Sequence, residues 1–234
     1  MRGVLLTALA AGLLAGLVFF GVQSVTTRPL IAQAELHEQA ESRAAAAMPG
    51  HVAQQVEWEP GEGVERAAYT VAADVLIGVG YAFLLVGAIS LSGRTVTPAS
   101  GLAWGAAGFL VFVAAPSLGL PPEPPGGHAA DLLSRQAWWL GTACATAAGL
   151  WLLLMQRRPW LRVAGAALLA APHMIGAPRL ADAGIEDHAE LARRFVWASL
   201  AANAALWATL GLAAGRFYPG LNRIPAGASL SARA

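Results

Sequence analysis

Long apolar runs separated by shorter polar connections dominate the chain. About 20 apolar residues are needed for a helix to cross a hydrocarbon core roughly 30 Å thick. Five runs reach this length, at residues 4–25, 68–91, 101–120, 136–155 and 195–215. A sixth run, residues 160–176, is shorter and holds Pro172 and His173 near its end. The pattern predicts an all-α, polytopic membrane helix bundle with six transmembrane helices, or five if the short run does not span.

The connections set the expected organisation. Residues 26–67 form one long acidic outer loop, in which residues 28–48 are predicted to be a charged, alanine-rich helix with Pro29 in its first turn. Prolines at 121, 122, 124 and 125 make the third connection stiff and non-helical. We expect a single integral membrane domain over residues 1–218 and a disordered cytoplasmic tail over residues 219–234.

Composition supports a membrane protein, since 56% of the 234 residues are hydrophobic, 12% are charged and 26 are glycine. Three glycine pairs spaced four apart predict close helix packing: Gly12 with Gly16, Gly101 with Gly105, and Gly211 with Gly215.

In the six-helix arrangement, the acidic residues outside the apolar runs all lie on one side of the membrane. One side then carries eight arginines and no acid, and the other carries seven arginines and thirteen acids. With five spans, the acidic loop at residues 179–194 moves to the acid-free side, so the charge pattern favours six. Arginines in the short connections 92–98 and 156–162 indicate that both termini are cytoplasmic and that the acidic side faces outward.

Residue types and motifs that the sequence lacks exclude several kinds of chemistry. The chain has no lysine, and therefore neither a Walker A phosphate loop nor a lysine Schiff base. Its single cysteine, Cys144, cannot form an intramolecular disulfide or a CxxC pair, and we expect it to be a small core residue. HExxH and GxSxG motifs are absent as well. We expect no enzymatic activity, no cofactor and no nucleic-acid partner.

The side chains best suited to a transition metal lie at the end of the short apolar run. His173 and Met174 offer an imidazole and a thioether, which suit such a metal better than Mg²⁺ or Ca²⁺. A short, proline-interrupted membrane segment is also a pointer to a substrate site. In the alternative interpretation, His173 caps the helix or bonds to a neighbouring carbonyl.

Other candidate residues are acidic or lie in the outer loops. Asp74 lies about two turns inside the second apolar run, where its charge must face the bundle interior. It is either part of a cation site or a structural partner of Arg194 or Arg135. Glu35, Glu123 and His128 lie in outer loops where they would attract or hand over a cation, although loop acids need have no function.

Several motifs resemble the CbtA family of predicted cobalt transporter subunits. They are Gly119-Leu-Pro-Pro-Glu-Pro-Pro-Gly126, Arg135-Gln-Ala-Trp138-Trp-Leu-Gly-Thr142 and Pro172-His-Met-Ile-Gly-Ala-Pro178. Glu65-Arg-Ala-Ala-Tyr-Thr70 and the following Gly78-Val-Gly80 are similar too. The resemblance extends from the first apolar run to Tyr218.

This resemblance implies a subunit of a bacterial inner-membrane system that takes up cobalt for cobalamin supply. It also implies a small, single-span, histidine-bearing companion, CbtB, and the family is described as having five spans. We therefore expect Co²⁺, or a similar divalent metal, to enter from the outer face. Glu35, Glu123 and His128 would attract it, and His173, Met174 and Asp74 would form an inner station. The alternative is a membrane scaffold or assembly partner for a companion permease.

Overall fold

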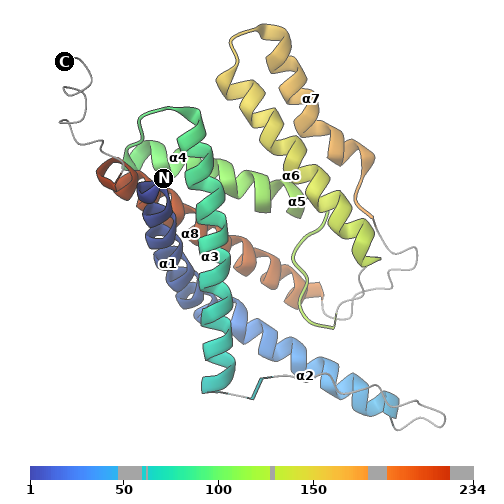
Figure 1. The fold of residues 1–234 in the computed structure, drawn as a ribbon. Helices are drawn as coiled ribbons and strands as arrows, with labels where there is room; N and C mark the ends of the chain where they lie inside the picture. The colour runs from blue at the N-terminus through green and yellow to red at the C-terminus, as the bar shows by residue number, and fades with distance from the viewer. Residues whose placement is uncertain (47–59, 62, 127–129, 179–188, 222–234) are drawn as a thin grey trace, which may run out of the picture. The chain divides into compact units, whose positions relative to one another are not determined.

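All regular structure in the described residues of the computed structural model is helical; these are residues 1–46, 60–61, 63–126, 130–178 and 189–221 (Figure 1). The fold class predicted from the apolar pattern is confirmed. The elements in chain order are α1 (Arg2–Val25), α2 (Thr27–Ala46), α3 (Val64–Ser92), α4 (Pro98–Phe109), the π-helix η1 (Leu110–Ala114), α5 (Ala115–Ser117), α6 (Leu132–Met155), α7 (Pro159–Ile175) and α8 (Ala189–Leu221).

Five helical segments are long and apolar enough to cross a membrane: α1, α3, the continuous α4–η1–α5 stretch Pro98–Ser117, α6 and α8. The short sixth run is also helical, as α7, but its 17 residues are too few for this length criterion. The five-helix alternative therefore describes the clear spans, and the count of six stays a prediction.

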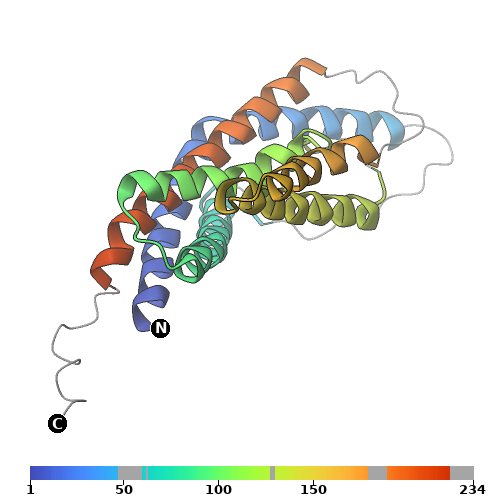
Figure 2. The ribbon, with the colours of Figure 1, turned by 90° about the horizontal axis from the view of Figure 1, so that it is seen from above.

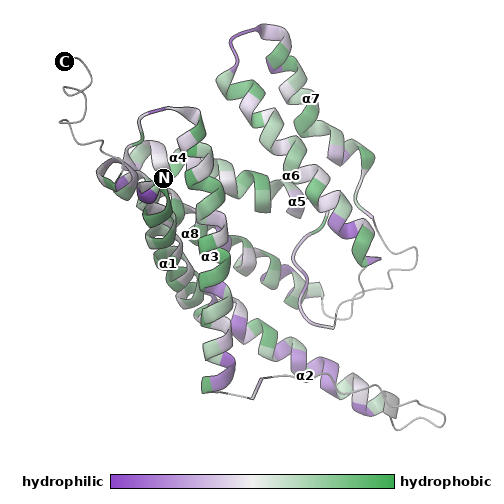
Figure 3. Cartoon of the chain, viewed as in Figure 1, coloured by the Kyte–Doolittle hydropathy of each residue, from purple (hydrophilic) through white to green (hydrophobic). Residues whose placement is uncertain are grey.

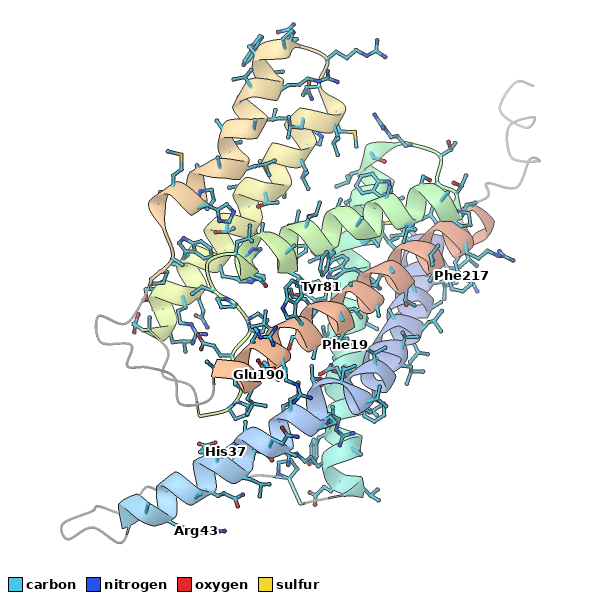
Figure 4. All side chains as sticks on the ribbon, turned by 180° about the vertical axis from the view of Figure 1, so that it is seen from behind. Phe19, His37, Arg43, Tyr81, Glu190 and Phe217 are labelled. Atoms are coloured by element: carbon cyan, nitrogen blue, oxygen red, sulfur yellow. The ribbon has the colours of Figure 1, made fainter. Side chains whose placement is uncertain are left out.

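The predicted charged helix of the first outer loop is confirmed as α2. It begins at Thr27, directly after a turn at Thr26, so that Pro29 lies in its first turn, where the missing N–H costs nothing. Hydrophilic residues predominate along α2, whereas α1 and most of α3 are hydrophobic (Figure 3). His37 and Arg43, labelled in Figure 4, are both exposed on this helix.

The chain divides into two compact units whose borders fall inside helices. Unit 1 comprises Met1–Phe20, Ala67–Ala106 and Ala205–Ala234, and unit 2 comprises Gly21–Arg66 and Ala107–Ala204. The expectation of one membrane domain over residues 1–218 stays a prediction, and residues 222–234 lie outside the described part. α8 itself continues to Leu221.

Unit 1 is held together by the predicted glycine pairs. A Cβ placed on Gly16 would lie 2.6 Å from the Val75 Cα atom, so α1 and α3 touch backbone to backbone. A Cβ on Gly101 would lie 2.9 Å from the Gly215 Cα, which brings α4 against α8 in the same way. The expectation of close packing at these glycines is confirmed, because any side chain there would force the helices apart.

An antiparallel hairpin of α6 and α7 forms much of unit 2 (Figures 1 and 2). The two helices approach closest at Gly149 and Gly165, where a Cβ on either glycine would lie 2.8 Å from the carbonyl oxygen of the other. α6 also contacts η1 and α5. The Phe112 ring of η1 lies 6.2 Å from the Trp139 ring of α6, centroid to centroid.

Candidate functional site

The three motif segments meet around Trp138 in unit 2. A Cβ on Gly119, after α5, would lie 2.7 Å from Trp138 Cζ2 and 2.9 Å from the Ala177 Cβ. The imidazole of His173 lies edge-on to the Trp138 indole, with ring centroids 6.2 Å apart and an interplanar angle of 69°. Residues that are 19 to 39 positions apart from Trp138 in sequence thus surround one indole. We call this region the motif end of the hairpin.

The end of α7 presents His173 and Met174 to the surface. Pro172 is buried, whereas both following side chains are exposed, Met174 by 85%. Gly176 closes the helix with its N–H donating to the Pro172 carbonyl at 3.0 Å and adopts φ 84° and ψ 151°. Only glycine occupies this conformation readily. The cap at this helix end is thus a backbone bond of Gly176, and the alternative interpretation of His173 as a capping residue stays a prediction. Among the described residues, its imidazole makes no hydrogen bond or ion pair.

Hydrogen bonds and an ion pair fix the start of α6 at the motif end. Asp131 caps the helix: its Oδ2 accepts from the Ser134 N–H at 3.0 Å. Arg135 donates through Nη2 to Glu123 Oε2 at 3.4 Å, which ties the proline-rich connection to α6. Glu123 is therefore partly neutralised, although 37% of its side chain remains exposed.

Glu35 pairs with an arginine. Arg66, in α3, donates through Nη1 to Glu35 Oε2 at 3.2 Å and through Nη2 to Glu35 Oε1. Such a two-point arrangement matches the planar guanidinium to both carboxylate oxygens. It joins α2 to the beginning of α3 within unit 2. The expected role of Glu35 in attracting a cation stays a prediction, and its geometry supplies a structural role instead.

Asp74 lies in unit 1, on α3, and is only 5% exposed. A Cβ on Gly16 of α1 would lie 2.7 Å from the Asp74 carbonyl oxygen, so this part of α3 packs directly against α1. The expectation that Asp74 faces the interior is confirmed. His173 and Met174 belong to unit 2, and a station shared with Asp74 stays a prediction.

The remaining expectations have different outcomes. His128 lies outside the described residues. Within the described part of the chain, no three His, Cys, Asp or Glu side chains converge to hold a metal ion. Cys144 is exposed on α6, so its assignment to the core is wrong. The face of α6 that carries Cys144 is the one turned away from α7 and η1, which a single residue in an apolar run does not reveal.

The structure points to three residues of α6 as candidate site residues that the sequence alone did not single out. Trp138 and Thr142 were noticeable only as parts of one motif, whereas Thr146 resembles any other small residue of an apolar run. The hydroxyls of Thr142 and Thr146 are buried, with 1% and 3% of each residue exposed. The spacing of four residues between Trp138, Thr142 and Thr146 is the one available signal, because it places all three on neighbouring positions of one helix face.

Comparison with curated proteins and with solved structures gave no match. A family model described as a probable cobalt transporter subunit, CbtA, matches residues 1–219. The match covers α1 to α7, α8 as far as Pro219, and every segment at the motif end. The chain therefore belongs to the CbtA family of membrane cobalt transporter subunits.

Proposed function

We propose that this chain carries Co²⁺, or a similar divalent transition metal, across the bacterial inner membrane to supply cobalamin synthesis. The observation that carries the proposal is the meeting of the three family motifs around Trp138, with the His173 imidazole exposed beside it. Exposure makes this nitrogen ligand accessible to an arriving ion. The neighbouring Met174 thioether adds a second soft donor.

The chain works with a partner in this proposal. His173 and Met174 supply two donors, fewer than a transition-metal site normally requires, and the described residues hold no cluster of three His, Cys, Asp or Glu. His128, which belongs to the proline-rich connection, would add a third donor from the chain itself, and a histidine-bearing single-span companion would hand the ion to this site. The subunit character of the family supports the presence of such a partner.

Uptake of radiolabelled cobalt by cells that express the chain and its companion, and lack other cobalt importers, tests the role of His173. We expect His173→Ala to lower the initial rate at least about tenfold, the factor that corresponds to about 1.4 kcal/mol. His37→Ala is the matched control, because His37 is also an exposed imidazole of unit 2 but lies on α2. Equal rates for wild type and His173→Ala, at equal membrane abundance, would contradict the proposal.

A second candidate function is a non-transporting scaffold for a companion permease. The close glycine packing in unit 1 and the lack of a three-ligand cluster in the described residues favour it. Purified chain in liposomes separates the two functions. Cobalt entry driven by a membrane potential supports a permease, whereas entry only after addition of a permease subunit supports a scaffold.

A further inference from the structure

Three polar atoms on one face of α6 are buried without a hydrogen-bond partner among the described residues. They are the Trp138 Nε1–H and the hydroxyl oxygens of Thr142 and Thr146. Buried polar groups are normally satisfied by protein atoms or by ordered water. Three such groups on successive turns of one helix therefore call for a common ligand.

Two other threonines satisfy their hydroxyls locally, whereas the Thr7 hydroxyl of α1, in unit 1, is also buried without a partner among the described residues. The hydroxyls of Thr26 and Thr209 each donate at 2.8 Å to the carbonyl four residues earlier, which is the ordinary solution in an apolar helix. Thr142 and Thr146 make no such bond. Their oxygens remain available to a molecule that enters beside α6.

Helical geometry places both hydroxyls at the junction of three elements. Gly149 faces α7, where a Cβ would meet the Gly165 carbonyl, and Trp139 faces the Phe112 ring of η1. Each residue of an α-helix turns by about 100°. Measured around the α6 axis from Trp138, the positions are about 20° for Gly149, 40° for Thr142, 80° for Thr146 and 100° for Trp139. Thr142 and Thr146 thus point between α7 and η1.

Both elements across from these threonines have interrupted backbone hydrogen bonding. In η1 the Ala115 N–H bonds to the Leu110 carbonyl, five residues back, and the buried Pro116 that follows has no N–H. The buried Pro172 likewise removes a donor inside α7. Carbonyl oxygens released in this way are tolerated at membrane depth where protein or a water-filled cavity satisfies them. π-helical turns are also frequent at functional sites.

We propose that Trp138, Thr142 and Thr146 line a hydrated path between α6, α7 and η1, along which the divalent cation moves with part of its water. This inference rests on the proposed function, and it names the residues that the transported ion would pass. Neighbouring members are one turn apart, about 5–6 Å between Cβ atoms, a span that one water bridges with two hydrogen bonds of about 2.8 Å. The threonine oxygens can accept from water or contact the cation, while the Trp138 N–H, a donor only, holds water at the motif end.

The path ends one turn beyond Thr146. At Gly149 and Gly165 the two helices touch through their backbones, and Leu152 and Leu153 surround the contact. The side chains nearest to the two glycines in the described structure, Leu152, Leu153 and Leu169, are apolar. The proposed path is therefore hydrated from the motif end to Thr146 and closed below it.

Thiol labelling tests the hydration. In a Cys144→Ala background, Thr142→Cys and Thr146→Cys are exposed to a charged methanethiosulfonate, which reacts with thiolates that water can reach. Native Cys144, exposed on α6 about 200° around the helix from Thr142, is the matched control, because we expect this opposite, apolar face to contact lipid in a membrane. We expect both new cysteines to react at least about tenfold faster than Cys144. Reaction no faster than that of Cys144 would overturn the hydrated path.

Cobalt uptake tests whether the ion uses the path. Thr→Val at both positions keeps the shape and removes the hydroxyls, whereas Thr→Ser retains them. We expect the double valine variant to lower the initial rate at least about tenfold and the double serine variant to stay within about threefold of wild type. A wild-type rate in the valine variant, at equal membrane abundance, would overturn the path even if the chain transports cobalt. If the wild type takes up no cobalt, the proposed function is refuted instead. The labelling experiment would still show whether water reaches positions 142 and 146.

Discussion

Trp138 links the family motifs at the scale of single residues. Its indole fills the space that a side chain at Gly119 would need, beside the Ala177 Cβ at the same glycine, and it lies edge-on to the His173 ring. The motif glycine, the tryptophan and the Pro-His-Met segment are therefore parts of one packed unit. Their sequence spacing alone gives no indication of this contact.

Replacing Gly119 with alanine should disturb this unit. The new Cβ would lie 2.7 Å from Trp138 Cζ2 and 2.9 Å from the Ala177 Cβ, so the indole or the turn must shift. We expect a loss of stability of about 1–3 kcal/mol, typical of overpacking, and lower cobalt uptake, measured by thermal unfolding in detergent and by initial rate. Gly141→Ala is the control, because a Cβ on Gly141 meets nothing within 4 Å. Equal effects of the two substitutions would contradict the contact.

Glu35 is expected to matter for stability and not for transport. Its carboxylate is held at two points by Arg66, with roughly a third of each side chain exposed, 28% and 35%. Glu35→Gln should lower stability by about 1 kcal/mol or less and leave cobalt uptake within about twofold of wild type. A large loss of uptake without a loss of stability would contradict this expectation and would support the role of Glu35 in attracting the ion.

The sequence indicated which residues have side chains suited to a metal and which of them are buried, but it did not indicate their ion-pair partners. The burial of Asp74 follows from its depth in an apolar run. The pairs Glu123–Arg135 and Glu35–Arg66 depend on how segments 12 and 31 residues apart meet, which charge patterns do not encode. The same is true of Cys144, whose exposure depends on which face of α6 the neighbouring elements leave uncovered.

At the scale of elements, the apolar pattern predicted α3 and α7, which carry Asp74 and His173, and the charged, alanine-rich sequence predicted α2, which carries Glu35. The charged helix after the first span, the glycine contacts and the short helix at 159–175 were all foreseeable from composition and spacing. The π-helical turn at Leu110–Ala114 was not, because a single extra residue in a helical turn leaves no mark in an apolar run.

The α6–α7 hairpin depends on the contact between Gly149 and Gly165. A Cβ on Gly165 would lie 2.8 Å from the Gly149 carbonyl oxygen and 3.0 Å from the Leu152 Cβ, so Gly165→Ala forces the helices apart. We expect a loss of about 1–3 kcal/mol, measured as a lower unfolding temperature in detergent. Gly87→Ala, in open space on α3, should be neutral or stabilising. A Gly165→Ala variant as stable as Gly87→Ala would argue against the hairpin contact.

At the scale of the molecule, the number of spans decides which side each terminus occupies. α7 packs antiparallel along α6 from the Trp138–His173 contact to the connection between the two helices. Its 17 residues are about 25 Å long at 1.5 Å per residue, close to the hydrocarbon thickness of about 30 Å. The hairpin is compatible with the six-span arrangement that the charge distribution favours, and the count of six stays a prediction.

A fluorescent protein fused after residue 234 tests this arrangement in cells. Six spans place both termini in the cytoplasm, where the fusion fluoresces, and a second fusion before residue 1 should behave in the same way. Fluorescence from the N-terminal fusion alone, with the C-terminal fusion dark at equal expression, would indicate five spans.

The most direct test of transport is the initial rate of cobalt entry into liposomes that contain only the purified chain, under an inside-negative potential. Such a potential favours entry of a cation by about 2.3 kcal/mol per charge per 100 mV. We predict entry well above that of protein-free liposomes, rising with the potential and lowered at least about tenfold by His173→Ala. Entry at the protein-free rate at every potential would contradict the conclusion that this chain itself carries the ion.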